Sequence, residues 1–305
     1  MTSVAVIPAI GIGDGLLMMI ASEQLKRHGY HVTTFHHALP ELSSWLPGHD
    51  LRPLPPEEQQ GEVLCRYDLI LVENDNSPNI RRWIADFRKQ LCIFYPSYRA
   101  EKHAPLFPMD QVFDPDIPMA DNIARAIANV MGLFAPCKDN GLTPPNSFVH
   151  RAKKEQILIH PTSRVLSKNW KARGFFQVAR SLSRQGLNPL FCVGPSEEDA
   201  WGFPVAKPAS LSDLAALIYE SGVVIGNDSL AGHLASNLGV PTITIANDAK
   251  RMLLWRPGWL KGELILPPTY LPNWKCLRLR EKYWQHFISS NQVLKKINML
   301  VQKIN

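Results

Sequence analysis

Short apolar runs alternate along the chain with longer stretches in which apolar residues recur every three or four positions. The short runs are typical of strands buried in a parallel sheet, and the longer stretches are typical of helices that cover it. The predicted strands are Val4–Pro8, His31–Phe35, Leu69–Glu73, Leu91–Tyr95, Ile157–Pro161, Pro189–Val193, Val223–Gly226, Thr242–Ala246 and Leu264–Leu266. The predicted helices include Leu16–Arg27, Ile80–Lys89, Phe175–Gln185, Leu211–Glu220, Leu230–Leu238 and Asn291–Lys303. The pattern therefore predicts an α/β fold.

The segment Cys137–Gln156 interrupts this alternation, because it is polar, contains one glycine and two prolines, and has no sustained period. A chain of 305 residues also suits two domains better than one. We therefore expect two Rossmann-like domains, residues 1–145 and 146–305, that face a cleft. The carboxyl ends of their strands would line the cleft, and the last predicted helix would pack back on the first domain.

A formal net charge of +6 suits an anionic partner such as a nucleotide or a phosphorylated lipid, although a basic surface can also serve solubility alone. The chain has no recognisable nucleic-acid-binding motif, so no nucleic-acid partner is expected. Its five cysteines are dispersed and odd in number, without metal-ligand spacing, which favours a reducing, cytoplasmic compartment. The apolar N-terminal run is broken by Pro8, three glycines and Asp14, so it predicts a strand, a turn and a helix rather than a signal peptide or a membrane span.

Polar groups at one strand end indicate a phosphate site. The strand Val223–Gly226 runs into Asn227-Asp228-Ser229, and a helical pattern with His233 follows. The free amides at the start of a helix bind phosphate through hydrogen bonds and the helix dipole. The alternative is ordinary capping of the helix by Asp228 or Ser229.

Two more strand ends of the same half carry compatible groups. Thr162 and Ser163 close one strand and precede Lys168, a set that can bind and neutralise a pyrophosphate. Glu197 follows another strand, where a carboxylate can accept hydrogen bonds from ribose hydroxyls. Together the three strand ends indicate a nucleotide-diphosphate site.

With these motifs the chain resembles the bacterial ADP-heptose–lipopolysaccharide heptosyltransferases, glycosyltransferase family nine, which have the GT-B fold. The resemblance covers most of the chain. It rests on the order and spacing of Ile12-Gly13-Asp14, His160-Pro161-Thr162-Ser163, Lys168, Trp170, Gly194, Glu197, Gly226-Asn227-Asp228-Ser229, His233-Leu234-Ala235 and Leu238-Gly239-Val240-Pro241.

The resemblance implies an inverting, metal-independent transfer of heptose from ADP-heptose to a lipopolysaccharide inner-core acceptor, without a cofactor. Thr162, Ser163 and Lys168 would then hold the donor diphosphate, and Glu197 the ribose. Asp228, Ser229 and His233 would face the donor's sugar and phosphates. Asp14 would be the general base, although it can also be the N-cap of the following helix.

The acceptor side is expected in the first domain, where an anionic glycolipid would favour basic residues. Arg99 and Lys102 follow a strand end and are the candidate acceptor-binding residues. The pairs Arg81-Arg82 and Arg88-Lys89 suit either this role or a solvated helix face. A basic aromatic cluster near the C-terminus suits peripheral contact with the inner face of the inner membrane, or a surface helix. It comprises Arg278, Arg280, Lys282, Tyr283 and Trp284.

One residue departs from the family pattern. Leu230 stands where the family usually has a glycine after Asp-Ser, and a Cβ there crowds the approach of phosphates to the backbone. A different nucleotide-sugar donor, or a catalytically silent binding protein, is therefore the alternative.

Three further motifs partly match the sequence patterns of cofactor or metal sites. Leu16 replaces the third glycine of a dinucleotide fingerprint, which argues against NAD. Asp114-Pro115-Asp116 has the spacing of a metal-binding DxD but lies in a proline-rich loop, so we expect a turn. His36-His37 has no third ligand at a suitable spacing, so no metal site is predicted.

Overall fold

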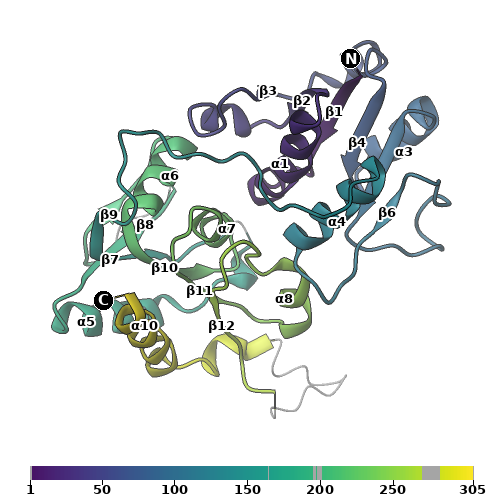
Figure 1. The fold of residues 1–305 in the computed structure, drawn as a ribbon. Coiled ribbons are helices and arrows are strands. Elements are labelled where there is room, and N and C mark those ends of the chain that lie inside the picture. The colour runs from purple at the N-terminus through teal and green to yellow at the C-terminus, as the bar shows by residue number, and fades with distance from the viewer. Residues whose placement is uncertain (1, 164, 195–196, 198–200, 270–281, 305) are drawn as a thin grey trace. The chain divides into compact units, whose positions relative to one another are not determined.

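The computed structural model in Figure 1 describes residues 2–163, 165–194, 197, 201–269 and 282–304, the side chains of residues 303 and 304 excepted. The chain divides into two compact units, Met1–Thr143 and Pro144–Asn305. In the described part of the chain, no helix has both the length and the apolar character that crossing a membrane requires.

The first unit contains a six-stranded sheet in which every paired strand is parallel to its neighbour, in the order β3-β2-β1-β4-β5-β6 (Figure 1). Its strands are β1 (Ser3–Ile7), β2 (His31–Phe35), β3 (Asp50–Arg52), β4 (Leu69–Glu73), β5 (Leu91–Tyr95) and β6 (Gln111–Val112). Its helices are α1 (Ile12–Arg27), the 3₁₀ helix η1 (Leu39–Leu42), α2 (Glu57–Leu64), α3 (Pro78–Phe87) and α4 (Met119–Met131). Aliphatic strand residues pack against Trp83 and Phe87 of α3 to form a core on one face of the sheet.

The second unit repeats this plan with a parallel sheet in the order β12-β11-β10-β7-β8-β9. Its strands are β7 (Lys153–His160), β8 (Asn188–Cys192), β9 (Val205–Ala206), β10 (Ser221–Asn227), β11 (Thr242–Ile245) and β12 (Glu263–Ile265). Its helices are η2 (Leu166–Lys168), α5 (Ala172–Arg184), α6 (Leu211–Glu220), α7 (Leu230–Asn237), α8 (Ala249–Trp255), η3 (Trp284–His286) and α10 (Ser290–Ile304). The α/β prediction is confirmed, with two parallel sheets where two were expected.

The last helix packs within the second unit. Helix α10 contacts α5, β10 and β12, and these contacts bury Val293 and Ile297 in the core of that unit (Figure 1). Trp284 belongs to the same core, and its indole N–H donates a hydrogen bond to the carbonyl of Ser167 at 3.1 Å. The expectation that Trp284 contributes to a membrane-facing cluster is therefore wrong. Arg278 and Arg280 of that cluster lie outside the described residues.

The element bounds differ from the predicted ones at two places that matter for the site. Helix α1 begins at Ile12 rather than Leu16, because the glycines around Asp14 lie in the first helical turn instead of a preceding loop. Strand β7 begins at Lys153, inside the predicted linker. Its polar first residues pair with β10 and β8, and the Gln156 amide donates to Ser221 Oγ at 2.8 Å.

Candidate functional site

Each sheet has one point where the strand order reverses. In the first unit the chain runs outward from β1 to β2 on one side and returns to β4 on the other, and in the second unit β7 stands in the same way between β8 and β10. Ligands of open parallel sheets bind outside the carboxyl ends of the strands at such a switch point. The predicted base follows β1, and the predicted phosphate-binding residues follow β7 and β10.

Asp14 lies in the first turn of α1, where Gly11 is the N-cap. The alternative in which Asp14 caps this helix is therefore wrong. A Cβ on Gly11 would collide with the Asp14 carboxylate, so the position of this carboxylate requires glycine at residue 11. The turn thus presents a half-buried acid at the end of β1.

His36 braces this turn from the end of β2. The Ala38 N–H donates to His36 Nδ1 at 3.2 Å, which leaves His36 Nε2–H to donate to the Gly11 carbonyl, also at 3.2 Å. Burial, followed by the nearby His37, lowers the pKa of His36 to about 4, so the ring is neutral at physiological pH. The ring packs against Gly15, where a Cβ would stand 3.1 Å from its Nε2. His36 is therefore a structural support of the turn.

Glu73 braces the turn from the other side, and sequence reasoning missed it. Its side chain is 2% exposed and accepts a hydrogen bond from the Ala9 N–H at 3.2 Å. Burial raises the pKa of Glu73 well above its usual value, and the nearby charge of Asp14 raises it further. This carboxyl therefore holds its proton more tightly than an exposed glutamate does. The only sequence signal for it was an acidic residue that ends an apolar strand.

In the second unit, Lys168 and Asp228 form an ion pair across the switch point. Lys168 Nζ lies 2.9 Å from Asp228 Oδ2, and the Arg251 guanidinium, which sequence reasoning also missed, lies 3.5 Å from the same oxygen. Arg251 is carried by α8, which Asp248 caps through bonds to the backbone N–H groups of residues 250 and 251. Two cations thus meet at the end of β10.

Helix α7 begins directly after this ion pair. Ser229 occupies its N-cap position, yet the side chain makes no capping hydrogen bond, and its Oγ is buried without a partner among the described residues. In the same part of the chain, the buried Nδ1 of His233 also has no hydrogen-bond partner. Burial lowers the pKa of His233, so its imidazole is neutral at physiological pH. The start of α7 therefore combines free amides, two unpaired polar atoms and two nearby cations, which suits an anionic oxygen-rich ligand.

The other predicted donor-binding residues are held in hydrogen bonds beside it. Thr162 Oγ1 donates to Glu197 Oε2 at 2.9 Å, and the Gly194 N–H donates to the same oxygen at 2.5 Å. Ser163 Oγ turns to Asn169 Oδ1 at 2.7 Å. The structure thus brings Thr162 to Glu197 and Lys168 to Asp228, beyond the carboxyl ends of the neighbouring strands β8, β7 and β10.

Asn227 ties these strand ends together. Its Nδ2 donates to the Pro161 carbonyl at 2.6 Å, and its Oδ1 accepts the Trp170 N–H at 2.8 Å. The side chain is 1% exposed and so fixes both ends of the loop that carries Thr162, Ser163 and Lys168. Sequence reasoning treated Asn227 as part of the ligand motif and did not predict this clamp.

Only one of the two candidate acceptor residues lines a cavity in the structure. Lys102 lines a cavity of about 230 Å³ in the first unit, whereas Arg99 is exposed and is not among the residues that line this cavity. Arg81 does line it. The neighbouring Arg82 bonds to Glu57 and Gln60 of helix α2 and has a structural role.

The other motifs noted in the sequence do not form a binding site among the described residues. The Asp116 N–H donates to Asp114 Oδ1 at 2.9 Å, which confirms the turn predicted for Asp114-Pro115-Asp116. Over the described ranges, no three His, Cys, Asp or Glu side chains gather as a metal site would require. Cys65, Cys92, Cys137 and Cys192 are free thiols.

The fold is that of the GT-B glycosyltransferases. A glycosyl transferase family 9 structure from Veillonella parvula is similar, with a TM-score of 0.70 at 18% identity over 99% of this chain and 98% of that one. The ADP-heptose lipopolysaccharide heptosyltransferase II of Escherichia coli has a TM-score of 0.70 at 17% identity over 99% of both chains. At these identities the likeness concerns the fold alone.

The family resemblance inferred from the sequence is confirmed over the middle of the chain. Residues 129–257 match the model of glycosyltransferase family 9 (heptosyltransferase). Lipopolysaccharide heptosyltransferase 3 of Escherichia coli K12 is 30% identical over 118 residues, which are 34% of this chain and 34% of that protein. The match thus spans about a third of this curated relative.

Proposed function

We propose that the chain is a glycosyltransferase that moves a heptose from ADP-heptose to an anionic lipopolysaccharide inner-core acceptor. The observation that carries the proposal is the start of α7, where unpaired Ser229 Oγ and His233 Nδ1 lie with the cations Lys168 and Arg251. The family match includes all four residues. The names of the similar proteins support heptose as the sugar and lipopolysaccharide as the acceptor class.

In this proposal the second unit stabilises the departing diphosphate. The free amides of α7 and the Ser229 hydroxyl would donate to phosphate oxygens, and Lys168 would turn from Asp228 to the diphosphate as charge develops on it. Arg251 would remain to neutralise Asp228. Glu197 would accept bonds from the ribose through the oxygen that does not bind Thr162 and Gly194.

The first unit would supply the base. Asp14 would take the proton of the acceptor hydroxyl while that oxygen bonds to the anomeric carbon and the bond to the diphosphate breaks, which inverts the anomeric configuration. The raised pKa of Glu73 favours its protonated form, so negative charge at this switch point falls preferentially on Asp14, as a base requires. We place the reaction at the cytoplasmic face of the inner membrane, through peripheral contact only.

Two substitutions test the assignment. Asp14→Asn should abolish transfer and leave ADP binding intact, because the base does not contact the nucleotide. Lys168→Ala should weaken ADP binding about tenfold or more, since it removes a charge-assisted contact. The exposed residues Asp86 and Lys154 provide the controls Asp86→Asn and Lys154→Ala. Transfer at the wild-type rate by Asp14→Asn would refute the catalytic role.

Leu230 favours a second candidate, the same reaction with a different nucleotide sugar. It is the first residue of α7 and is half-buried, so its Cβ stands where the diphosphate approaches the helix. A thermal-shift panel of ADP, UDP, GDP and CMP decides, because a ligand stabilises the folded state according to its affinity. If another nucleotide raises the unfolding temperature more than ADP does, the donor carries that nucleotide instead of ADP. If none of the four raises it, the protein is catalytically silent.

A further inference from the structure

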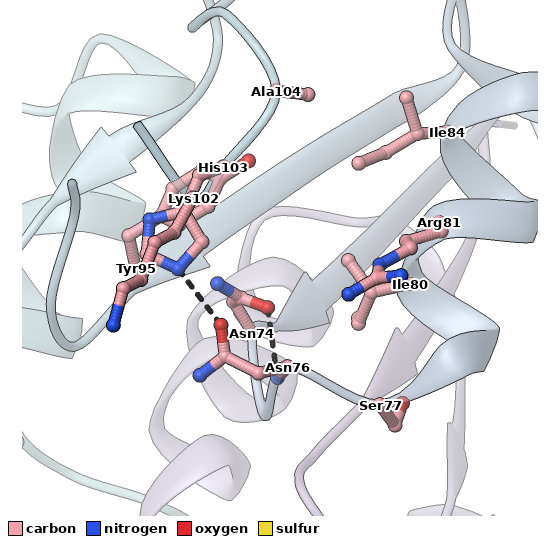
Figure 2. Close-up of a pocket in the computed structure, with 10 residues that line it drawn as sticks. All are labelled: Asn74, Asn76, Ser77, Ile80, Arg81, Ile84, Tyr95, Lys102, His103 and Ala104. Atoms are coloured by element: carbon pink, nitrogen blue, oxygen red, sulfur yellow. Dashed lines mark hydrogen bonds between the residues drawn. The ribbon is translucent and has the colours of Figure 1, made fainter. Parts of the chain in front are cut away.

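The cavity that Lys102 lines lies in the first unit, outside the carboxyl ends of β4 and β5. It has a volume of about 230 Å³ and is lined by residues of the β4–α3 turn, helix α3 and the loop after β5. Figure 2 shows Arg81 on the helix side and Lys102 and His103 on the opposite side, with Asn74 and Asn76 between them. Asn74 directly follows Glu73, so the cavity adjoins the switch point that carries Asp14.

The floor of the cavity is preformed. Asn76 has a positive φ of 61°, and its N–H donates to Asn74 Oδ1 at 3.0 Å. The Arg99 N–H donates to His103 Nδ1 at 2.8 Å, which leaves His103 Nε2–H to donate to Asn76 Oδ1 at 2.7 Å (Figure 2). These bonds fix the strand-end turn and the loop to each other before any ligand binds.

The cavity carries uncommitted positive charge. Neither Arg81 nor Lys102 forms an ion pair or a side-chain hydrogen bond with the described residues, and both are exposed. Arg88 differs, because it pairs with the buried Asp110. Helix α3 also begins at this cavity, and its N-cap Ser77 makes no side-chain capping bond, so the positive end of the helix dipole adds to the two cations.

Tyr95 provides the independent sign of a ligand. It lines the cavity and is 1% exposed, and its hydroxyl is buried without a hydrogen-bond partner within the described ranges. Burial, with the nearby Asp110 charge, raises the pKa of Tyr95 to about 12, so the phenol keeps its proton. A buried donor without an acceptor costs free energy, which a ligand oxygen would recover.

We propose that this cavity binds the anionic group of the acceptor sugar, with Arg81 and Lys102 pairing with its charge and Tyr95 donating to it. The inference rests on the proposed glycosyl transfer and adds the residues that select the acceptor. The cavity is smaller than the roughly 300–1,000 Å³ typical of drug-sized ligands, which suits one sugar unit. Ile80 and Ile84 supply an apolar wall for the face of the ring. The group recognised is a carboxylate or a phosphate carried by a sugar.

Binding of three probes to the full chain tests this proposal: a uronic acid, a hexose 6-phosphate and the uncharged hexose. We expect at least one charged probe to bind at millimolar concentration and the hexose not to bind. Whichever charged probe binds more tightly identifies the carboxylate or the phosphate. Arg81→Ala and Lys102→Ala should each weaken binding about tenfold. Arg125→Ala, which removes an exposed arginine of helix α4, is the matched control and should bind as the wild type does.

Tyr95→Phe keeps the ring and removes only the unpaired hydroxyl. The variant should be at least as thermally stable as the wild type without ligand, yet bind the charged probe more weakly. Equal binding by the wild type, Arg81→Ala and Lys102→Ala would overturn the proposal, as would equal binding of the hexose. ADP binding measured on the same variants separates the two proposals: it should be unchanged, and its absence in the wild type would refute the transferase proposal instead.

Discussion

Glu73→Gln exchanges a buried carboxyl group for an amide of nearly the same shape at the end of β4. The amide oxygen can still accept the hydrogen bond from the Ala9 N–H, so the β1–α1 turn should keep its position. The substitution therefore removes the titration of Glu73 and little else. That makes it a test of the raised pKa of this buried acid beside Asp14.

The magnitude follows from proton linkage. Glu73 has a usual pKa of 4.5, which applies to the unfolded chain, and burial beside Asp14 raises the pKa in the folded protein. Above pH 4.5 the unfolded chain releases this proton while the folded protein retains it. The free energy of unfolding therefore falls as pH rises, by about 1.4 kcal/mol per pH unit, until the pH reaches the folded pKa. Glu73→Gln lacks this slope, so its stability relative to the wild type should increase steadily above pH 4.5.

The assay is urea unfolding of both proteins at a series of pH values between 4 and 8. The exposed Glu58 provides the control Glu58→Gln, which should follow the wild-type curve. Parallel curves for the wild type and Glu73→Gln over this range would mean that Glu73 is ionised in the folded protein. The reasoning that leaves the negative charge on Asp14 would then fail.

Three further predictions concern other positions. Gly226→Ala should destabilise the protein by about 1–3 kcal/mol, because its Cβ would stand 2.7 Å from the His160 carbonyl oxygen, whereas Gly61→Ala in open space on α2 should stabilise it by about 0.5–1 kcal/mol; thermal unfolding compares them. Leu230→Gly should tighten ADP binding in calorimetry, and an unchanged affinity would mean that the diphosphate does not pass this side chain. His36 has a pKa lowered from 6.5 to about 4, so its contribution to stability is complete above pH 6.5 and is lost as pH falls towards 4; His36→Gln should flatten the acid side of the unfolding curve, and an unflattened curve would contradict the shift.

The strands were largely predictable because apolar runs end sharply at polar residues. The bounds of β4 and β5 agree with the apolar runs residue for residue. The start of β7 was not predictable, since its first four residues are polar and gain their strand conformation from pairing with neighbours. The early start of α1 was also not predictable, because Gly11 and Gly13 suggest a turn and carry no helical period.

The site was predictable as a set of strand ends and not as a set of contacts. The strand–helix alternation placed Lys168 and Asp228 at the same edge of one sheet, but only the structure pairs them, across 60 residues of sequence. Glu73 was missed because a single acid after an apolar strand has no local signal that distinguishes it from a strand terminus. Arg81 and Arg82 are neighbours with different surroundings, since the helix turns one to a cavity and the other to α2.

The bidentate clamp made by Asn227 has a consequence for how donor preference can change. The Asn227 amide binds the backbone at Pro161 and at Trp170, so a single side chain holds the two ends of the intervening loop together. These two bonds are to the backbone, and Asn227 Nδ2 also donates to Asn169 Oδ1 at 3.4 Å. Exchange of residues 162–168 between related chains should therefore leave the backbone contacts of Asn227 in place while it replaces Ser163 and Lys168, two of the residues that we propose contact the nucleotide.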